Sequence, residues 1–213
     1  ESGKDLGRVG TIYGIWASNL SSPDVQAVQR EMAPKLAGFR DELYQNAELF
    51  QRIDTIYNSD AYDDLTPEQQ RLVWDYQTDF VRAGAALDDA QKARVGEINQ
   101  ELASLYTEFS NNLLHDEEAY VTWLSEDEIG GLPASVLSNA KSAAASRDNE
   151  GGEYAVLNTR SSMDPFLTYS TDRDLRKKVW ETYYSRGDNG DEYDNNAIIA
   201  DLMKLRAERS KIF

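Results

Sequence analysis

The sequence contains no cysteine and a single histidine, His115, among its 213 residues. The lack of cysteine excludes disulfides, thiol nucleophiles and thiolate metal sites, and it is compatible with the cytoplasm as well as the bacterial periplasm. The single imidazole excludes a metalloprotease H-E-x-x-H helix, because that motif needs two histidines four residues apart. Taken alone, these residue types indicate a soluble helical domain without chemistry of its own.

Basic residues are scarce as well, with 22 Lys and Arg against 38 Asp and Glu, so the formal net charge is −16. Nucleic acids and anionic membranes attract basic surfaces, and this balance of charge argues against both. No apolar run approaches the roughly 18 residues that cross a bilayer, and no secretory signal opens the chain. We therefore expect neither nucleic acid nor a membrane as a partner.

What the sequence does contain is apolar residues at helical spacing along most of its length. Between Asp89 and His115 these residues step by three or four, which places them on one face of a helix. They are Val95, Ile98, Leu102, Leu105, Phe109 and Leu113. The sequence Thr66-Pro67-Glu68-Gln69 predicts a capping box that opens a helix reaching to about Leu87. The apolar side of this second helix comprises Leu72, Val73, Tyr76 and Phe80.

Other helices are predicted from caps, prolines and shorter apolar repeats. They cover residues 6–20, a segment from 23 onwards with a kink or break at Pro34, 46–56, 133–146, a segment from a capping box at 171–174 through 183, and a last helix from 193 to the end. Only residues 119–123 and 154–158 have strand composition, and we expect them to pair as a small antiparallel ribbon. The predicted fold class is thus mainly all-α, a multi-helix domain with one small ribbon.

His115 is the first candidate functional residue, because histidine titrates near neutral pH and can act as a general base. Its position at the end of a long helix favours a structural interpretation. There it would donate to free helix carbonyls and lie at the negative end of the helix dipole. A Ser/His/Asp arrangement has no supporting motif, since no G-x-S-x-G sequence is present.

The acidic stretch Asp188–Asp194 invites a calcium interpretation, but its register does not match an EF-hand loop. Starting from Asp188, Gly190 falls at position 3 and Tyr193 at position 6. A loop between helices, with Asp194 at or near the next N-cap, explains the same residues. The segment 148–152 likewise predicts a turn. None of the 38 carboxylates stands out as half of an acid/base pair.

Several short strings then follow one another in a distinctive order. They are Arg71–Tyr76, Asp79–Ala85, Gly131-Leu132-Pro133, Tyr154–Asn158, Ser185-Arg186-Gly187, Glu192–Asn195 and Leu205–Lys211. This succession resembles the N-terminal helical region of bacterial peptidyl-dipeptidases, in the oligopeptidase A, thimet oligopeptidase and neurolysin family of zinc metallopeptidases. The resemblance covers nearly the whole chain, although none of the strings is catalytic in itself.

The resemblance implies an all-helical enzyme with a deep channel, in which one zinc held by H-E-x-x-H and a downstream Glu activates water. No catalytic, cofactor-binding or metal-binding residue can be carried over to this chain. Residues 1–213 would form a single noncatalytic helical region that lines the channel, truncated at both ends and separate from the zinc domain. The implied activity of the parent protein is release of C-terminal dipeptides from oligopeptides. An oligopeptidase A-like endopeptidase and a non-enzymatic helical binding module are the alternatives.

Further expectations follow from this interpretation. Oligopeptides would be the substrates and zinc the cofactor of the full enzyme, with none bound by this chain. We expect the cytoplasm, with the periplasm left open, and the sequence does not define an oligomeric state. If the last helix lacks its packing partners, its apolar residues should be exposed. These are Ile198, Leu202, Leu205 and Ile212.

Overall fold

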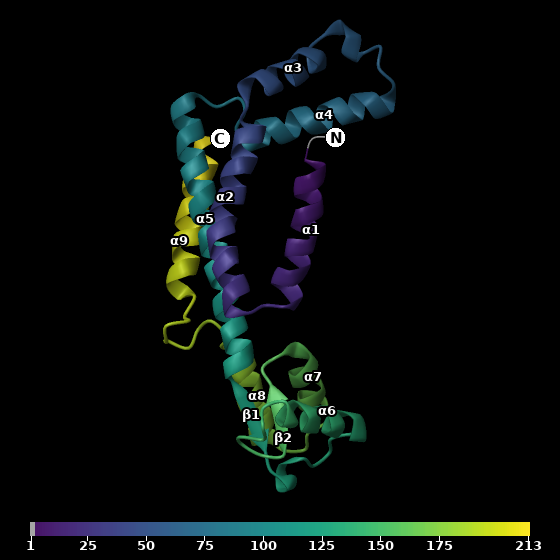
Figure 1. Ribbon diagram of the computed structural model, residues 1–213, viewed down its shortest axis with the longest axis vertical. Coiled ribbons are helices and arrows are strands. Elements are labelled where there is room, and N and C mark those ends of the chain that lie inside the picture. The colour runs from purple at the N-terminus through teal and green to yellow at the C-terminus, as the bar shows by residue number, and fades with distance from the viewer. Residues whose placement is uncertain (1–2) are drawn as a thin grey trace. The chain divides into compact units, whose positions relative to one another are not determined.

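The computed structural model describes residues 3–213 (Figure 1). This part of the chain forms two compact units, one from residues up to Glu108 together with Ile199–Phe213, and one from Phe109–Ile198. We call them the first and the second unit. The described residues contain nine α-helices, two short 3₁₀-helices and a single two-stranded sheet, which confirms the mainly α fold class.

The helices of the first unit are α1 (Lys4–Asn19), α2 (Pro23–Tyr44), α3 (Ala47–Tyr57), α4 (Pro67–Ala83), most of α5 (Asp89–Ala119) and most of α9 (Asn196–Ile212), with a 3₁₀ turn at Asp60–Tyr62. Three of these helices, α2, α3 and α4, begin at the caps that the sequence predicts. Thr66 and Gln69 form the expected capping box of α4, because each side chain bonds the other residue's backbone nitrogen. Gly84 ends α4 three residues before the predicted Leu87, since its φ of 101° suits glycine and stops the helix.

Pro34 lies inside α2, which continues through it without interruption. The predicted break is therefore absent. A proline removes its own backbone donor and crowds one preceding turn, and the hydrogen-bonded turns on both sides carry the helix past it.

The core of the first unit contains Phe80, Val95, Ile98 and Leu102, all less than 5% exposed. Three of them belong to the predicted apolar face of α5. Two members of the predicted apolar side of α4 are exposed instead, Leu72 at 56% and Tyr76 at 52%. Periodicity shows which residues share a helix face, but neighbouring helices decide how much of that face is covered.

The last helix also differs from its prediction. Ile198 and Leu202 are buried, and Leu205 and Ile212 are half-buried, so the expected exposure of these four residues is wrong. Within the first unit α9 is held against α5, as the hydrogen bond from Arg209 Nη1 to Asn99 Oδ1 shows. This contact gives the apolar face of α9 a partner inside the chain.

The second unit is built around the predicted ribbon. Strands β1 (Val121–Leu124) and β2 (Tyr154–Leu157) pair antiparallel, with Val121 opposite Leu157. Helices α6 (Ala134–Ala145), α7 (Arg160–Tyr169) and α8 (Arg173–Tyr184) pack with it, and a 3₁₀ turn lies at Glu126–Glu128. Its core comprises Leu124, Leu132, Ala140, Tyr154, Val156, Met163, Phe166 and Val179.

Three details of the second unit correct the sequence analysis. Ala119 ends α5 and so does not open the strand. Asp172, not Thr171, caps α8, because its carboxylate accepts from the backbone nitrogens of Asp174 and Leu175. Helix α7 is present in the structure but was not predicted, because Pro165 and two serines weaken its helical pattern. Burial of Met163 and Phe166 in the core accounts for its formation.

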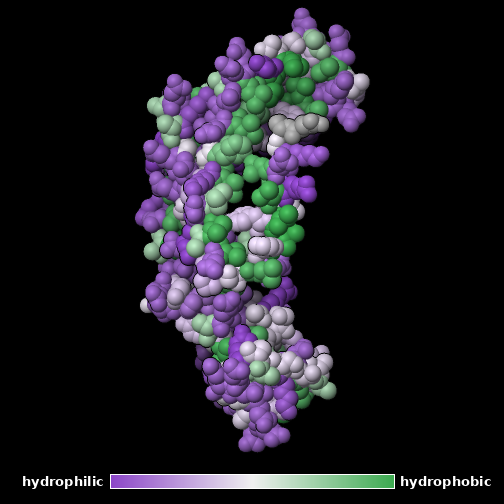
Figure 2. Space-filling model, in the orientation of Figure 1, coloured by the Kyte–Doolittle hydropathy of each residue, from purple (hydrophilic) through white to green (hydrophobic). Residues whose placement is uncertain are grey.

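Apolar side chains remain uncovered on the first unit. Figure 2 shows them gathered over α1, α2 and the α3–α4 pair. Helix α1 has no buried residue at all, and the exposed apolar residues of these helices include Val9, Ile12, Trp16, Leu20, Phe39, Leu43, Ile56 and Leu72. We call these eight residues the apolar face. Within residues 3–213 no helix combines the length and the hydropathy needed to cross a bilayer.

Candidate functional site

A groove of about 890 Å³ lies in the first unit between α2, α4, α5 and α9. Its polar wall contains Arg40, Asp41, Arg82, Asn99, Tyr106, Arg206 and Arg209. Its apolar wall contains Leu36, Val95, Leu102 and Phe213. We call it the arginine groove. Its volume lies in the range of ligand-binding clefts, and its walls combine apolar surface with a few charged groups, as such clefts do.

A polar relay crosses one side of this groove and joins three helices. Arg209 Nη1 on α9 donates to Asn99 Oδ1 on α5 over 2.8 Å, and Asn99 Nδ2 donates to the Asp41 carboxylate on α2 over 2.9 Å. Burial raises the pKa of Asp41, and the bond from Asn99 together with the charges of Arg40 and Arg209 opposes that rise. The relay thus places a partly buried carboxylate between two arginines.

Two further contacts hold α9 on α5. Arg94 forms a bidentate pair with Glu208, with Nε to Oε1 at 2.6 Å and Nη2 to Oε2 at 3.0 Å. The hydrogen bonds from Arg94 lower the pKa of Glu208, while the carboxylates of Glu208 and Glu97 raise the pKa of Arg94. Arg206 Nη1 donates to Tyr106 Oη over 2.8 Å. These bonds fix the side chains along the α5–α9 edge of the groove.

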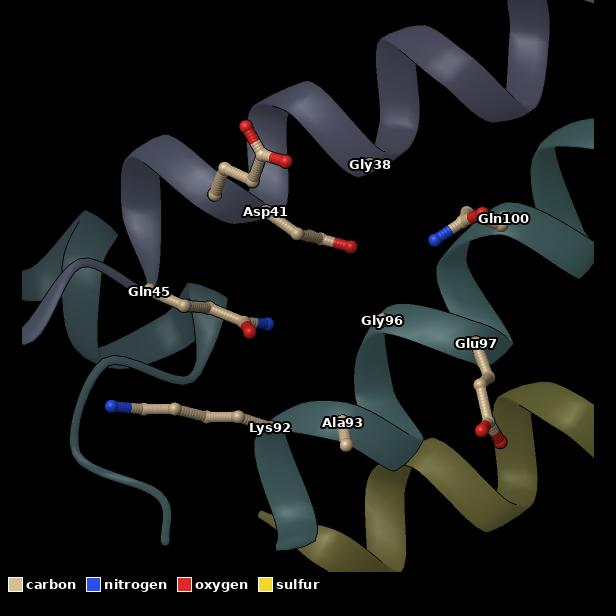
Figure 3. A pocket seen from close by; sticks show the side chains of 9 residues that line it. Gly38, Asp41, Gln45, Lys92, Ala93, Gly96, Glu97 and Gln100 are labelled. Atoms are coloured by element: carbon tan, nitrogen blue, oxygen red, sulfur yellow. The ribbon is translucent and has the colours of Figure 1, made fainter. Parts of the chain in front are cut away.

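A smaller pocket of about 390 Å³ lies between α2 and α5 on the other side of Asp41 (Figure 3). Gly38 and Gly96 leave this space open because neither carries a side chain. Asp41, Gln45 and Gln100 point into it, whereas Glu97 turns away. Its wall holds carboxylates and one lysine, Lys92, without a nucleophile paired to a base. Such a wall is suited to binding water or polar groups rather than to chemistry.

His115, the first candidate from the sequence, lies in the second unit and stacks on Tyr193 with ring centroids 3.4 Å apart. Its Nδ1 atom is buried and lies 3.5 Å from Oδ1 of Asp116. Within residues 3–213 no hydrogen bond from this imidazole to a helix carbonyl is found, so the predicted capping role is wrong. The ring instead holds the loop that carries Tyr193.

Asp116 is a polar residue that the sequence analysis missed. It is fully buried, and its Oδ2 atom accepts from Gly187 N at 2.7 Å and from Asn189 Nδ2 at 2.9 Å. The sequence held a signal of its burial, because Asp116 follows Leu113 by three residues and so continues the apolar side of α5. A carboxylate at a core-facing position has to find donors. The donors it finds belong to the loop between α8 and α9.

The acidic stretch Asp188–Asp194 forms this loop between helices. Asp194 Oδ1 accepts from Asn196 N at the start of α9, and Asp194 Oδ2 accepts from Gly190 N. These backbone bonds lower the pKa of Asp194. The carboxylate of Asp191 accepts hydrogen bonds from the backbone nitrogen of Tyr193 and from the hydroxyl of Tyr120. The carboxylates of Asp191 and Asp194 are therefore engaged in local structure, and no cluster of three potential metal ligands occurs in the described part of the chain.

No protein-family model matches the chain. Individual proteins are nevertheless similar to it in sequence. The chain is 31% identical over 218 residues to probable cytosolic oligopeptidase A of Arabidopsis thaliana, which covers 98% of this chain and 31% of that protein. It is 26% identical over 212 residues to oligopeptidase A of Escherichia coli, covering 97% of this chain and 31% of the relative. It is 28% identical over 216 residues to dipeptidyl carboxypeptidase of Salmonella typhimurium, covering 100% of this chain and 31% of the relative.

These similarities confirm the resemblance found in the sequence. The chain is homologous over nearly its whole length to the oligopeptidase A and dipeptidyl carboxypeptidase family. It spans about a third of the length of these relatives. The relatives are peptidases by name.

Proposed function

We propose that this chain is a noncatalytic helical part of a longer zinc-dependent peptidase that cleaves oligopeptides. The proposal rests on the share of this chain that the similarity covers, compared with the share of the relatives that it covers. The similarity to oligopeptidase A and dipeptidyl carboxypeptidase extends over nearly the whole chain, yet it accounts for only 31% of each of those proteins. In this proposal the remaining length supplies the chemistry.

The zinc implied by the family does not fit the residues of this chain. A catalytic zinc needs three protein ligands, usually His, Glu or Asp, around one open position. The sequence has one histidine, and residues 3–213 contain no group of three side chains able to hold a metal. We therefore propose that the zinc ligands and the general base of the enzyme belong to other parts of the longer protein, and we assign no catalytic step to the residues of this chain.

The role proposed for the chain is to form part of the wall of a substrate channel. The apolar face supports a place within a larger protein, because exposed apolar patches of this kind mark surfaces that another polypeptide covers. Residues 9–19 of α1 carry no charge in a chain of which 28% is charged. We propose that further polypeptide of the same enzyme covers α1. A channel wall would then select short unfolded peptides by excluding folded proteins.

Two products are open to such an enzyme. We propose release of C-terminal dipeptides, as in dipeptidyl carboxypeptidase, because the string from Asp79 to Gly84 resembles that type. Internal cleavage by an oligopeptidase A-like endopeptidase is the alternative. The cytoplasm remains the proposed compartment.

The test is to clone the complete reading frame that encodes these residues and to compare its product with this chain. Both proteins are incubated with zinc and an N-acetylated nonapeptide, and mass spectrometry identifies the fragments. The proposal expects the longer protein to release dipeptides stepwise from the carboxyl end and this chain to leave the peptide intact. Internal fragments would favour the endopeptidase. A reading frame that encodes no further domain would instead leave a non-enzymatic binding module.

A further inference from the structure

The arginine groove reverses the charge of the chain that surrounds it. The whole sequence carries a net charge of −16. The groove nevertheless brings together four arginines from three helices, Arg40 on α2, Arg82 on α4, and Arg206 and Arg209 on α9, with Asp41 as the one acidic side chain of its lining. A concave wall of one charge sign concentrates the local field and attracts groups of the opposite sign.

These arginines keep most of their donors available. Within residues 3–213 the side chains of Arg82 and Arg40 make no hydrogen bond or ion pair, and the guanidinium of Arg40 lies 5.6 Å from the ring centroid of Tyr44. Arg206 and Arg209 each use one Nη1 atom, on Tyr106 and Asn99 respectively. None of the four is neutralised by a direct carboxylate contact, in contrast to Arg94, which is paired with Glu208. Guanidinium groups with free N–H donors are suited to bidentate bonds with carboxylates.

The other wall of the groove is apolar. Leu36 and Phe213 are exposed, and Val95 and Leu102 form its floor at 1% and 4% exposure. A ligand that fits both walls needs carboxylates on one side and apolar groups on the other. The volume of about 890 Å³ corresponds to a ligand of a few amino-acid residues.

We propose that the arginine groove binds acidic oligopeptides, with their carboxylates on Arg40, Arg82, Arg206 and Arg209 and an apolar side chain against Leu102 and Phe213. The proposed function supplies only the choice of an oligopeptide as the ligand. The charge, the free donors and the apolar wall supply the preference for acidic sequences. The groove thereby adds a substrate preference to a wall that otherwise excludes by size alone.

The test is fluorescence anisotropy with this chain and a labelled, N-acetylated Glu-Leu-Glu-Phe-Glu peptide. Its matched control is the Gln-Leu-Gln-Phe-Gln amide. We expect saturable binding of the acidic peptide, at least tenfold weaker binding of the amide, and a loss of affinity when salt rises from about 50 to about 300 mM. Arg40→Gln and Arg82→Gln should each weaken binding about fivefold to tenfold, since each removes one charge-assisted bond of about 1–1.5 kcal/mol. Neither arginine side chain makes a hydrogen bond within the described fold, so neither substitution removes one.

The matched protein variant is Arg52→Gln on α3, which changes the net charge equally but lies outside the groove. It should leave the affinity unchanged. Equal losses with Arg52→Gln, equal affinity for the amide peptide, or no binding at all would each overturn the proposal. Displacement of the peptide by inorganic phosphate at the same concentration as the peptide would also overturn it, because the groove would then be a nonselective anion site.

The two proposals fail separately. If the product of the complete reading frame cleaves peptides but this chain does not prefer the acidic ligand, the groove proposal fails and the proposed function stands. If this chain binds the acidic peptide as expected but the longer protein cleaves nothing, the groove stands and the peptidase proposal fails.

Discussion

The side-chain amide of Asn99 donates to both carboxylate oxygens of Asp41, over 2.9 and 3.1 Å. This one residue therefore joins α5 to α2, and through Arg209 it also joins both to α9. The carboxylate at the centre of this junction is partly buried, and it lies at the boundary between the arginine groove and the smaller pocket. Its ionisation links the stability of the first unit to pH.

Substituting Asp41→Asn should change the pH dependence of stability. Because burial raises the pKa of Asp41, the folded chain holds this proton more tightly than the unfolded chain, so the ionised carboxylate costs stability. This cost in stability is absent at pH values below about 3.9, the pKa of an aspartate in the unfolded chain. It is complete at pH values above the raised pKa of Asp41 in the folded chain. We expect the stability of the Asp41→Asn variant relative to the wild type to improve as pH rises through that window, as urea unfolding at about pH 4 and about pH 7.5 will measure.

Asp201→Asn provides the control for that experiment, because Asp201 is exposed and pairs only with Lys204 on the surface of α9. Its stability relative to the wild type should not improve between the two pH values. A difference between the Asp41→Asn variant and the wild type that is constant with pH, or that moves in the opposite direction, would contradict the role assigned to burial.

Removing the buried carboxylate of Asp116 should destabilise the second unit. Asp116→Ala leaves the backbone N–H of Gly187 and the amide of Asn189 without their acceptor, which costs about 2–3 kcal/mol. Hydrogen exchange should show lost protection at Gly187. Asp116→Asn keeps an acceptor at the same place and should retain most of that protection. Equal behaviour of the two variants would show that the hydrogen bonds are not what matters.

Two glycine substitutions should change stability in opposite directions. A Cβ atom at Gly131 would lie 2.3 Å from the carbonyl oxygen of Tyr169, and its φ of +83° is unfavourable for other residues. Gly131→Ala should therefore cost about 1–3 kcal/mol or more. Gly14 lies within α1 with open space around its Cβ position, so Gly14→Ala should gain about 0.5–1 kcal/mol. Thermal unfolding followed by circular dichroism measures both.

The apolar face should bind hydrophobic dyes. Ile12 and Trp16 are 53% and 57% exposed, so replacing both with serine should lower the fluorescence of added ANS without altering stability by more than about 0.5 kcal/mol. Sedimentation should also show less self-association. Ile98→Ala in the core is the contrasting variant, with an expected loss of about 2–5 kcal/mol. Strong destabilisation by the serine pair would mean that α1 is already packed.

Local chemistry explains which parts of the fold were predictable. The Thr66 and Gln69 box depends on residues three apart, and the ribbon depends on two short strands with distinctive composition, so both can be recognised in the sequence. Helix α7 could not, because burial of Phe166 outweighs the weak helix propensity around Pro165. Whether Leu72 or Leu202 is covered depends on helices distant in the chain.

Little of the candidate site could be predicted from the sequence. The single histidine excluded a zinc helix directly. The arginine groove could not be predicted, because Arg40, Arg82 and Arg206 are far apart in the sequence and meet only through the packing of their helices. Asp116 lay between these cases. Its place on the apolar side of α5 indicated that it is buried. The hydrogen-bond donors of its carboxylate, however, come from a loop that follows 71 to 73 residues later.

We propose that this chain forms part of a peptidase whose catalytic residues lie elsewhere in a longer protein. The most direct test of this proposal is metal analysis after equilibrium dialysis of this chain and of the complete gene product against zinc, with peptide hydrolysis measured on the same samples. We expect one zinc and peptide turnover for the complete product, and neither tightly bound zinc nor turnover for this chain. One tightly held zinc together with hydrolysis in these 213 residues alone would contradict it.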